Sequence, residues 1–173
     1  MFYSLRKFLK PNKIVKYLIL SDLVFWTGWG LATPVFAVFI VEKIQGGNVL
    51  VVGIASTIFW LVKSLLMIPI GIFLDKKPSE KDDYLILLTG LFIASFVPFG
   101  YIFATAPWHI YLLQAVYGFS LALAFPGWLA IFSRHLDKGK ESTQWSLEST
   151  AIGLGMGVAG GLGGWIVMKF GFN

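Results

Sequence analysis

Three charged side chains lie inside long apolar stretches of this 173-residue chain: Asp22, Lys63 and Glu148. A charge in the hydrocarbon of a membrane is costly, and such residues usually face a cavity, a partner charge or a substrate pathway. Lys63 lies about 18 Å by helical rise from the end of its stretch, too deep to reach the interface easily. We therefore expect Lys63 to bind an anionic substrate group or to set the charge state of a coupling carboxylate. A buried Asp22–Lys63 ion pair, with Asp22 and Glu148 otherwise snorkelling to the interface, is the alternative.

These residues lie within five apolar stretches, each long enough to cross about 30 Å of hydrocarbon as a helix. The chain is 57% hydrophobic, with a mean hydropathy of +0.75, beyond the usual globular range. Residues 84–133 contain no Asp, Glu, Lys or Arg, and we place a break between two helices at Thr105–Trp108. The sequence predicts an all-α polytopic membrane protein in contact with lipid. Its single transmembrane domain, residues 1–173, is expected to hold helices at about 17–41, 48–74, 84–106, 108–133 and 145–168.

The basic residues favour one side of the predicted membrane. The net charge is +5, and the connections on the opposite side carry only Lys43 and Lys169. Because Lys and Arg are enriched in cytoplasmic segments, we expect a cytoplasmic N-terminus, location in the cytoplasmic (inner) membrane and no nucleic-acid partner. The cytoplasmic side then holds Arg6, Lys7, Lys10, Lys13, Lys16, Lys76, Lys77, Lys81, Arg134, Lys138 and Lys140.

The sequence shows no catalytic arrangement. There is no cysteine, and no HExxH, P-loop or nucleophile-elbow motif occurs. His109 and His135 fall at opposite membrane faces, so they cannot share a metal ion. Asp82 and Asp83 are expected in a solvated loop. We therefore expect no enzymatic activity, no metal and no cofactor.

The last apolar stretch is rich in glycine at helical spacing. Glycines four residues apart let membrane helices approach closely. A tightly packed helix is the first interpretation, and a helix that also slides against its partners is the alternative. The GxxxG pairs involve Gly153, Gly157, Gly160, Gly161 and Gly164.

The segment Gly71-Ile-Phe-Leu-Asp75-Lys76 resembles the signature of the major facilitator superfamily between its second and third helices. The family pattern GxLaDRxGRR is matched at Gly71, Asp75 and Lys76, whereas residues 78–80 depart from it. In that family this loop helps latch the two halves of a transporter. The resemblance therefore implies a gating role for these three residues, with Asp75 capping a helix or pairing with Arg134.

Two further segments are similar to patterns of the same superfamily. Gln114-Ala-Val-Tyr117-Gly118 resembles its helix-four pattern without the arginine, and residues 155–164 resemble its helix-five antiporter pattern. The resemblance implies part of an N-terminal six-helix bundle in which the first, second, fourth and fifth helices border a cavity. Beside Lys63, Asp22 and Glu148, the candidates for substrate contact or coupling are Gln114, Tyr117, Trp29, Trp26 and Trp128.

The resemblance implies a secondary active transporter of a small solute that works by alternating access. The chain ends after the fifth predicted helix, where the superfamily has two six-helix bundles. We therefore expect it to require a missing C-terminal half or a second copy. The alternative is a small oligomeric membrane protein, a structural subunit or pore that assembles through its fifth helix.

Overall fold

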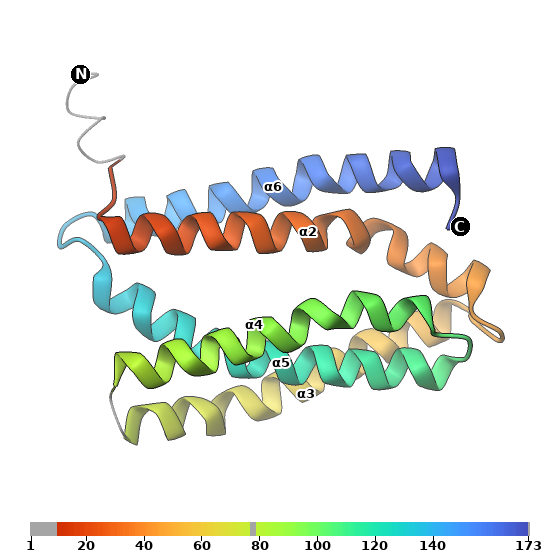
Figure 1. The fold of residues 1–173 in the computed structure, drawn as a ribbon, viewed down its shortest axis with the longest axis horizontal. Helices are drawn as coiled ribbons and strands as arrows, with labels where there is room; N and C mark the ends of the chain where they lie inside the picture. The colour runs from red at the N-terminus through yellow and green to blue at the C-terminus, as the bar shows by residue number, and fades with distance from the viewer. Residues whose placement is uncertain (1–9, 77–78, 173) are drawn as a thin grey trace. The chain divides into compact units, whose positions relative to one another are not determined.

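The structure, a computed structural model, describes residues 10–76 and 79–172, and these form five α-helices (Figure 1). Each helix is long and apolar enough to cross a membrane. The predicted all-α, five-helix membrane architecture is confirmed. The helices are α2 (Lys13–Lys43), α3 (Val49–Lys76), α4 (Glu80–Ile102), α5 (Pro107–His135) and α6 (Glu141–Phe170).

The helices extend into flanking residues that were expected to lie in loops. Helix α4 begins at Glu80, so Asp82 and Asp83 occupy its first turn, where the helix dipole favours negative charge. Asp83 is only 2% exposed. The expectation of a loop was therefore wrong for both residues, because hydropathy does not register a polar first turn. The expectation of a solvated charge was wrong for Asp83 only, since Asp82 is exposed.

The break in the uncharged stretch lies where it was expected, between Ile102 and Pro107. Pro107 suits the first helical position because it has no backbone N–H to leave unpaired. The Nδ1 atom of His109 accepts the backbone N–H groups of Thr105 at 3.2 Å and Ala106 at 3.1 Å. His109 thus holds the turn before its own helix.

The chain divides into two compact units, Met1–Ala37 with Phe132–Asn173, and Val38–Ile131. We call the first the α2–α6 unit, because it holds most of α2 and all of α6. The second, the α3–α5 unit, holds α3, α4 and most of α5.

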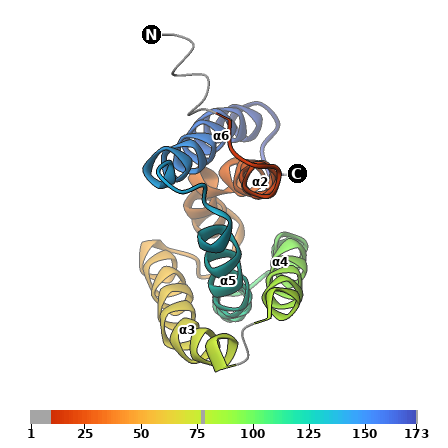
Figure 2. The same ribbon diagram turned by 90° about the vertical axis from the view of Figure 1, so that its left-hand side faces the viewer.

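In the α3–α5 unit, α5 lies between α3 and α4 (Figures 1 and 2). A Cβ at Gly118 of α5 would come within 2.6 Å of the Phe59 carbonyl oxygen on α3. A Cβ at Gly127 would come within 2.5 Å of the Asp83 carbonyl oxygen on α4. Helix α5 therefore contacts both neighbours backbone to backbone, and buried Leu121 and Ala124 belong to the core it forms.

In the α2–α6 unit the two long helices run parallel, side by side (Figures 1 and 2). The Cα of Met156 lies 2.9 Å from where a Cβ of Gly30 would stand. A Cβ at Gly163 would overlap the backbone of Leu31. Since lipid supplies no hydrophobic drive between helices, this close contact of small residues holds the pair together.

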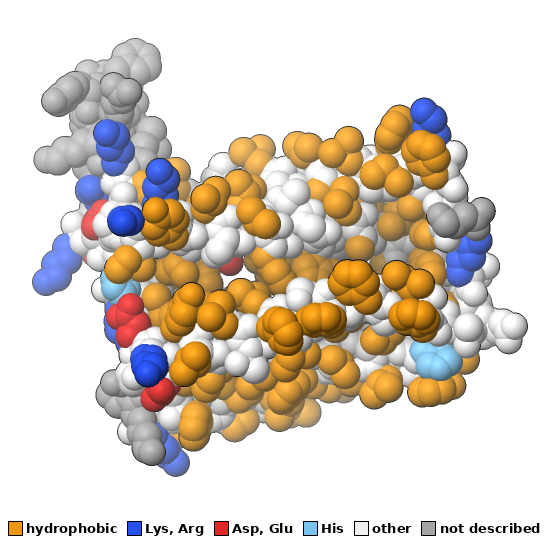
Figure 3. All heavy atoms as spheres, in the orientation of Figure 1, with side chains coloured by type: hydrophobic (Ala, Val, Ile, Leu, Met, Phe, Trp, Pro, Cys, Tyr) orange, Lys and Arg blue, Asp and Glu red, His pale blue; other side chains and the backbone are white. Residues whose placement is uncertain are grey.

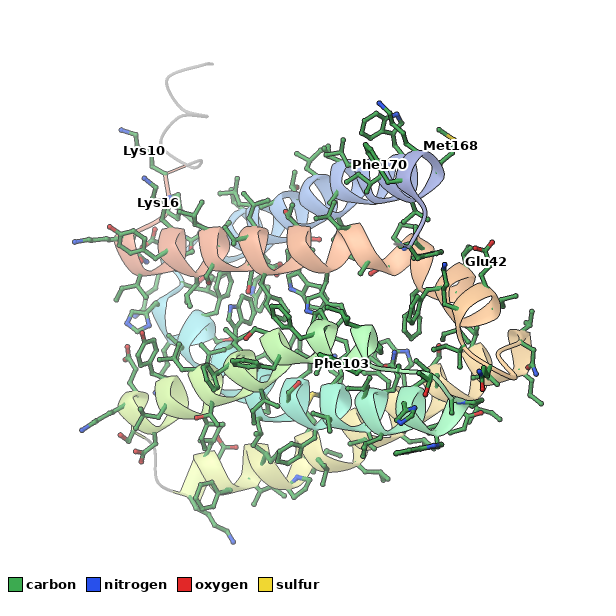
Figure 4. The ribbon with its side chains drawn as sticks, turned by 45° about the vertical axis from the view of Figure 1, so that its right-hand side comes forward. Lys10, Lys16, Glu42, Phe103, Met168 and Phe170 are labelled. Atoms are coloured by element: carbon green, nitrogen blue, oxygen red, sulfur yellow. The ribbon has the colours of Figure 1, made fainter. Side chains whose placement is uncertain are left out.

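The lateral surfaces of the helices are apolar and their ends are charged. In Figure 3 the Lys, Arg, Asp and Glu side chains in view gather mainly toward helix ends, with hydrophobic side chains between them. Lys10 and Lys16 project from the start of α2, and Met168 and Phe170 project from the end of α6 (Figure 4). Met168 is 79% exposed. These surfaces are those expected of helices whose sides contact lipid.

Candidate functional site

Lys63 is the central feature of the α3–α5 unit. It is near the middle of α3, and the close approach of α3 and α5 occurs beside it: a Cβ at Gly118 would lie 3.3 Å from the Lys63 backbone nitrogen. Its Nζ atom lies 5.0 Å from the ring centroid of Trp60 and 4.8 Å from that of Phe125. The ammonium is therefore flanked by one ring from its own helix and one from α5.

Acidic side chains do not neutralise Lys63 within this unit. Among its described residues, 38–76 and 79–131, no acidic side chain forms an ion pair with Lys63. The nearest acid along α3 is Asp75, about 18 Å away by helical rise. Each cation–π contact contributes about 0.5–2 kcal/mol, whereas a lysine at the centre of a membrane helix costs about 2.5–3.5 kcal/mol or more. Together the two rings contribute about 1–4 kcal/mol, which is of the same order as this cost, but they supply no negative charge.

The aromatic surroundings extend along α5. Trp128 is buried, and its ring stacks on Phe125 with centroids 6.3 Å apart. Tyr117 is also buried and stacks on Phe59 of α3 at 4.9 Å. The structure thus places two predicted candidates, Tyr117 and Trp128, on the helix that flanks Lys63.

Gln114 lies elsewhere on the same helix. It is 8% exposed and precedes Phe125 by eleven residues, which returns it to nearly the same face of α5 but about 17 Å away along the axis. The Lys63 ammonium lies over Phe125, whereas its backbone lies beside Gly118, one turn after Gln114. Phe125 and Trp60 were missed by sequence reasoning. Only the spacing of Trp60, one turn before Lys63, could have signalled its contact.

The α2–α6 unit contains both of the other intramembrane charges. Asp22 on α2 and Glu148 on α6 are each half-buried, and the charge of Glu148 acts on Asp22. Two such carboxylates repel each other, and binding of one proton or one cation relieves the repulsion. Trp29 follows Asp22 by two turns and so lies near the same face of α2, whereas Trp26 packs edge-on against Phe25 at 5.5 Å.

A polar cluster joins the start of α2 to the α5–α6 loop. Asn12 Nδ2 donates to the carbonyl of His135 and, at 3.1 Å, to Asp137 Oδ1. Gln144, which is fully buried, donates to Asp137 Oδ2 at 2.7 Å and accepts the Asp137 backbone N–H at 2.9 Å. The hydrogen bond from Asn12, then that from Gln144 and the charge of Lys140, lower the pKa of Asp137 below its ordinary value.

The described residues contain no candidate metal centre. Among residues 10–76 and 79–172, no group of three or more His, Asp or Glu side chains is placed to hold a metal ion. The charged groups instead lie singly or in pairs on helices that are long enough to span a bilayer.

A family model described as Major Facilitator Superfamily matches residues 18–173 of the chain. The chain belongs to this superfamily. The resemblance seen in the sequence is therefore confirmed, and with it the general class of membrane transport proteins. No curated protein and no solved structure matched the chain.

The superfamily loop signature is only partly visible in the structure. Gly71, Asp75 and Lys76 lie in the last turns of α3, while residues 77 and 78 fall outside the described residues. Arg134 belongs to the α2–α6 unit and Asp75 to the α3–α5 unit. Their pairing stays a prediction.

The glycines of α6, which resemble a superfamily pattern, divide into two sets. A Cβ at Gly155 or Gly163 would collide with α2, and one at Gly160 would lie 3.4 Å from Pro34 Cγ. The remaining predicted glycines would meet nothing within 4 Å, so they do not make the α2–α6 contact. A packing role against another surface stays a prediction for Gly153, Gly157, Gly161 and Gly164.

Proposed function

We propose that this chain forms part of a secondary active transporter that moves a small solute by alternating access. One observation carries the proposal: the superfamily match spans residues 18–173 and so includes all or most of each of five helices able to cross a membrane. Alternating access requires one bundle to rock against another around a midplane site. The second bundle would be a C-terminal half or a second copy of the chain.

In this proposal residues 1–173 act as one transmembrane domain of the inner membrane, with a cytoplasmic N-terminus. The basic segments before α2, between α3 and α4 and between α5 and α6 support this orientation. Gly71, Asp75 and Lys76 would form the gating loop with Arg134, as the superfamily pattern suggests.

Asp22 and Glu148 are the proposed coupling pair. They are half-buried carboxylates of one unit, and the charge of Glu148 acts on Asp22. A proton that relieves their repulsion would be taken up from one side of the membrane and released on the other. Gln114, Tyr117, Trp29 and Lys63 are the proposed substrate contacts.

The test is uptake of a panel of labelled small solutes into proteoliposomes that contain the chain together with its second bundle, either a second copy of the chain or a co-purified C-terminal half, with and without an imposed pH gradient. We expect at least one solute to accumulate against its gradient, and Asp22→Asn and Glu148→Gln to abolish accumulation but to leave exchange at equal concentrations. Ser146→Ala, a change at an exposed position of α6, serves as the control and should behave as the parent. Passive equilibration of every solute, insensitive to both substitutions, would contradict secondary transport.

A second candidate is an oligomeric membrane subunit or pore without transport activity of its own. The open face of α6 that contains Gly153, Gly157, Gly161 and Gly164 favours it, because such glycines pack helices of neighbouring subunits. The discriminating measurement is the oligomeric state in nanodiscs of the parent and of Gly157→Leu. Loss of a defined oligomer together with loss of an ion conductance would support the pore.

A further inference from the structure

We propose that Lys63, between the rings of Trp60 and Phe125, binds the charged group of a small, singly charged organic anion with an apolar body. The proposal rests on the proposed function, because this anion would be the transported solute. It goes further by naming the solute's chemical class and the group that recognises it.

The first step is the state of the lysine charge. Lys63 is half-buried in the middle of α3, and the acidic residues of its own unit lie at helix ends. Within residues 38–76 and 79–131, no carboxylate forms an ion pair with it. The contacts of its ammonium in this unit are two aromatic faces, at 5.0 and 4.8 Å. An ammonium held in this way can still form a charge-assisted hydrogen bond to an anion, which is the strongest contact open to it.

The second step is the charge of the ligand. A lysine is a compact point charge and not the planar fork that matches phosphate or a paired carboxylate. One lysine neutralises one negative charge, and no arginine occurs in residues 38–131. A multiply charged phosphate or dicarboxylate would leave charge uncompensated at membrane depth. The site therefore fits a monovalent anion.

The third step is the body of the ligand. The rings of Trp60 and Phe125 flank the ammonium, and the α3–α5 crossing beside the Lys63 backbone is apolar or aromatic too, with Val62 and the Phe59–Tyr117 stack. The hydroxyl of Ser120 on α5 already donates to the Tyr117 carbonyl at 2.7 Å. Few polar groups are left to satisfy sugar hydroxyls, whereas flat rings stack well on an apolar or aromatic body. An aromatic monocarboxylate meets both requirements.

The chief rival is an internal counter-ion, the carboxylate of Asp22. If Asp22 pairs with Lys63, the pair is structural and an added anion must compete with it. The two explanations predict opposite effects of Asp22→Asn on anion binding. Removal of an internal partner would create or greatly strengthen binding, whereas a lysine without such a partner already binds the anion in the parent chain.

The experiment is equilibrium binding of radiolabelled benzoate to the purified 173-residue chain in lipid nanodiscs, with empty nanodiscs subtracted. We expect saturable binding that unlabelled benzoate displaces and that benzylamine, benzyl alcohol and phosphate do not. Lys63→Met should weaken binding by about tenfold or more, since loss of one charge-assisted contact is worth that order. Lys63→Arg should retain most of it. If Lys63→Met does not fold, Lys63→Gln carries the same test.

Lys169 provides a matched control. Its Nζ atom also lies over two rings, those of Trp165 at 5.2 Å and Phe170 at 5.5 Å, but at the end of α6. Lys169→Met should leave benzoate binding unchanged. The proposal is overturned if benzoate does not bind, if benzylamine competes equally, if Lys63→Met binds as the parent does, or if binding appears only in Asp22→Asn. Because binding needs no gradient, benzoate can bind at Lys63 even if the chain does not transport. Conversely, transport without benzoate binding would overturn this proposal and leave the proposed function intact.

Discussion

At the level of single residues, the charged side chains of this protein have different neighbours inside the apolar helices and in the connections between them. Lys63 sits at mid-membrane with rings as neighbours, whereas Asp137 lies in the connection between α5 and α6 and is surrounded by donors. Among residues 38–76 and 79–131, no carboxylate forms an ion pair with the lysine. The carboxylate of Asp137 already accepts hydrogen bonds from Asn12 and Gln144, so it has a structural role.

The hydrogen bonds to the ionised Asp137 predict how pH changes the difference in melting temperature between the parent and Asp137→Asn. The folded-state pKa of Asp137 is below its ordinary value of 3.8, so its stabilisation is complete above that value and is lost as the pH falls through the folded value. We expect the substitution to lower the melting temperature of the chain in detergent at about pH 7, and the gap to narrow below about pH 3.8 as the parent is also protonated.

Glu42→Gln, which changes an exposed carboxylate near the opposite end of α2, is the control for general charge effects. It should leave the melting temperature close to that of the parent at both pH values. A gap between the parent and Asp137→Asn that stays constant down to acid pH would show that the cluster does not depend on the ionised carboxylate.

At the scale of helices, the packing of α6 depends on which glycines point at α2. A helix with this many glycines has several small faces, and the pattern alone does not say which one is used. The parallel register with α2 places Gly155 and Gly163 at the contact and leaves their neighbours open. One rotational setting of the helix therefore decides the role of each glycine.

Two adjacent glycines of α6 test this register. A Cβ at Gly163 would overlap the Leu31 carbonyl, while one at Gly164 would meet nothing within 4 Å. We expect Gly163→Ala to destabilise the chain by about 1–3 kcal/mol, as overpacking does, and Gly164→Ala to be neutral or slightly stabilising. Thermal unfolding in detergent measures both. Equal effects of the two changes would mean that α2 and α6 pack on another face.

At the scale of the whole molecule, the asymmetry of basic residues is the argument for orientation. In a chain of five spans, the basic N-terminal segment and every second connection lie on the same side of the membrane. One orientation places all of these basic segments in the cytoplasm. The chain contains no cysteine, so introduced thiols report accessibility without background.

We predict that Lys76→Cys and Lys138→Cys react with a membrane-impermeant maleimide only from the cytoplasmic side, in inside-out vesicles. Gln45→Cys, in the exposed turn between α2 and α3, should react only in intact cells. These three labels place three connections independently. Reaction of Lys76→Cys and Lys138→Cys from opposite sides would refute the alternating five-span orientation.

The hydrocarbon environment of this protein, and hence its helical secondary structure, follow from the order of its amino acids. The free energy of transferring apolar side chains into hydrocarbon adds up residue by residue. Five stretches of spanning length, and the break before Pro107, could therefore be recognised without knowledge of any tertiary contact. The superfamily was also readable, because its signature around Gly71 and Asp75 is local in sequence. The depth of Lys63 followed in the same way from helical rise.

Which helix faces meet is a matter of tertiary packing. The stack of Phe125 over Lys63, the burial of Asp83 beneath Gly127 and the choice of Gly163 over Gly164 all depend on the rotation and register of one helix against another. Apolar helices in lipid carry almost no amphipathic pattern to reveal these choices, since lipid and protein interior are similarly apolar. Close packing between backbones sets them instead, and that is a property of pairs of segments.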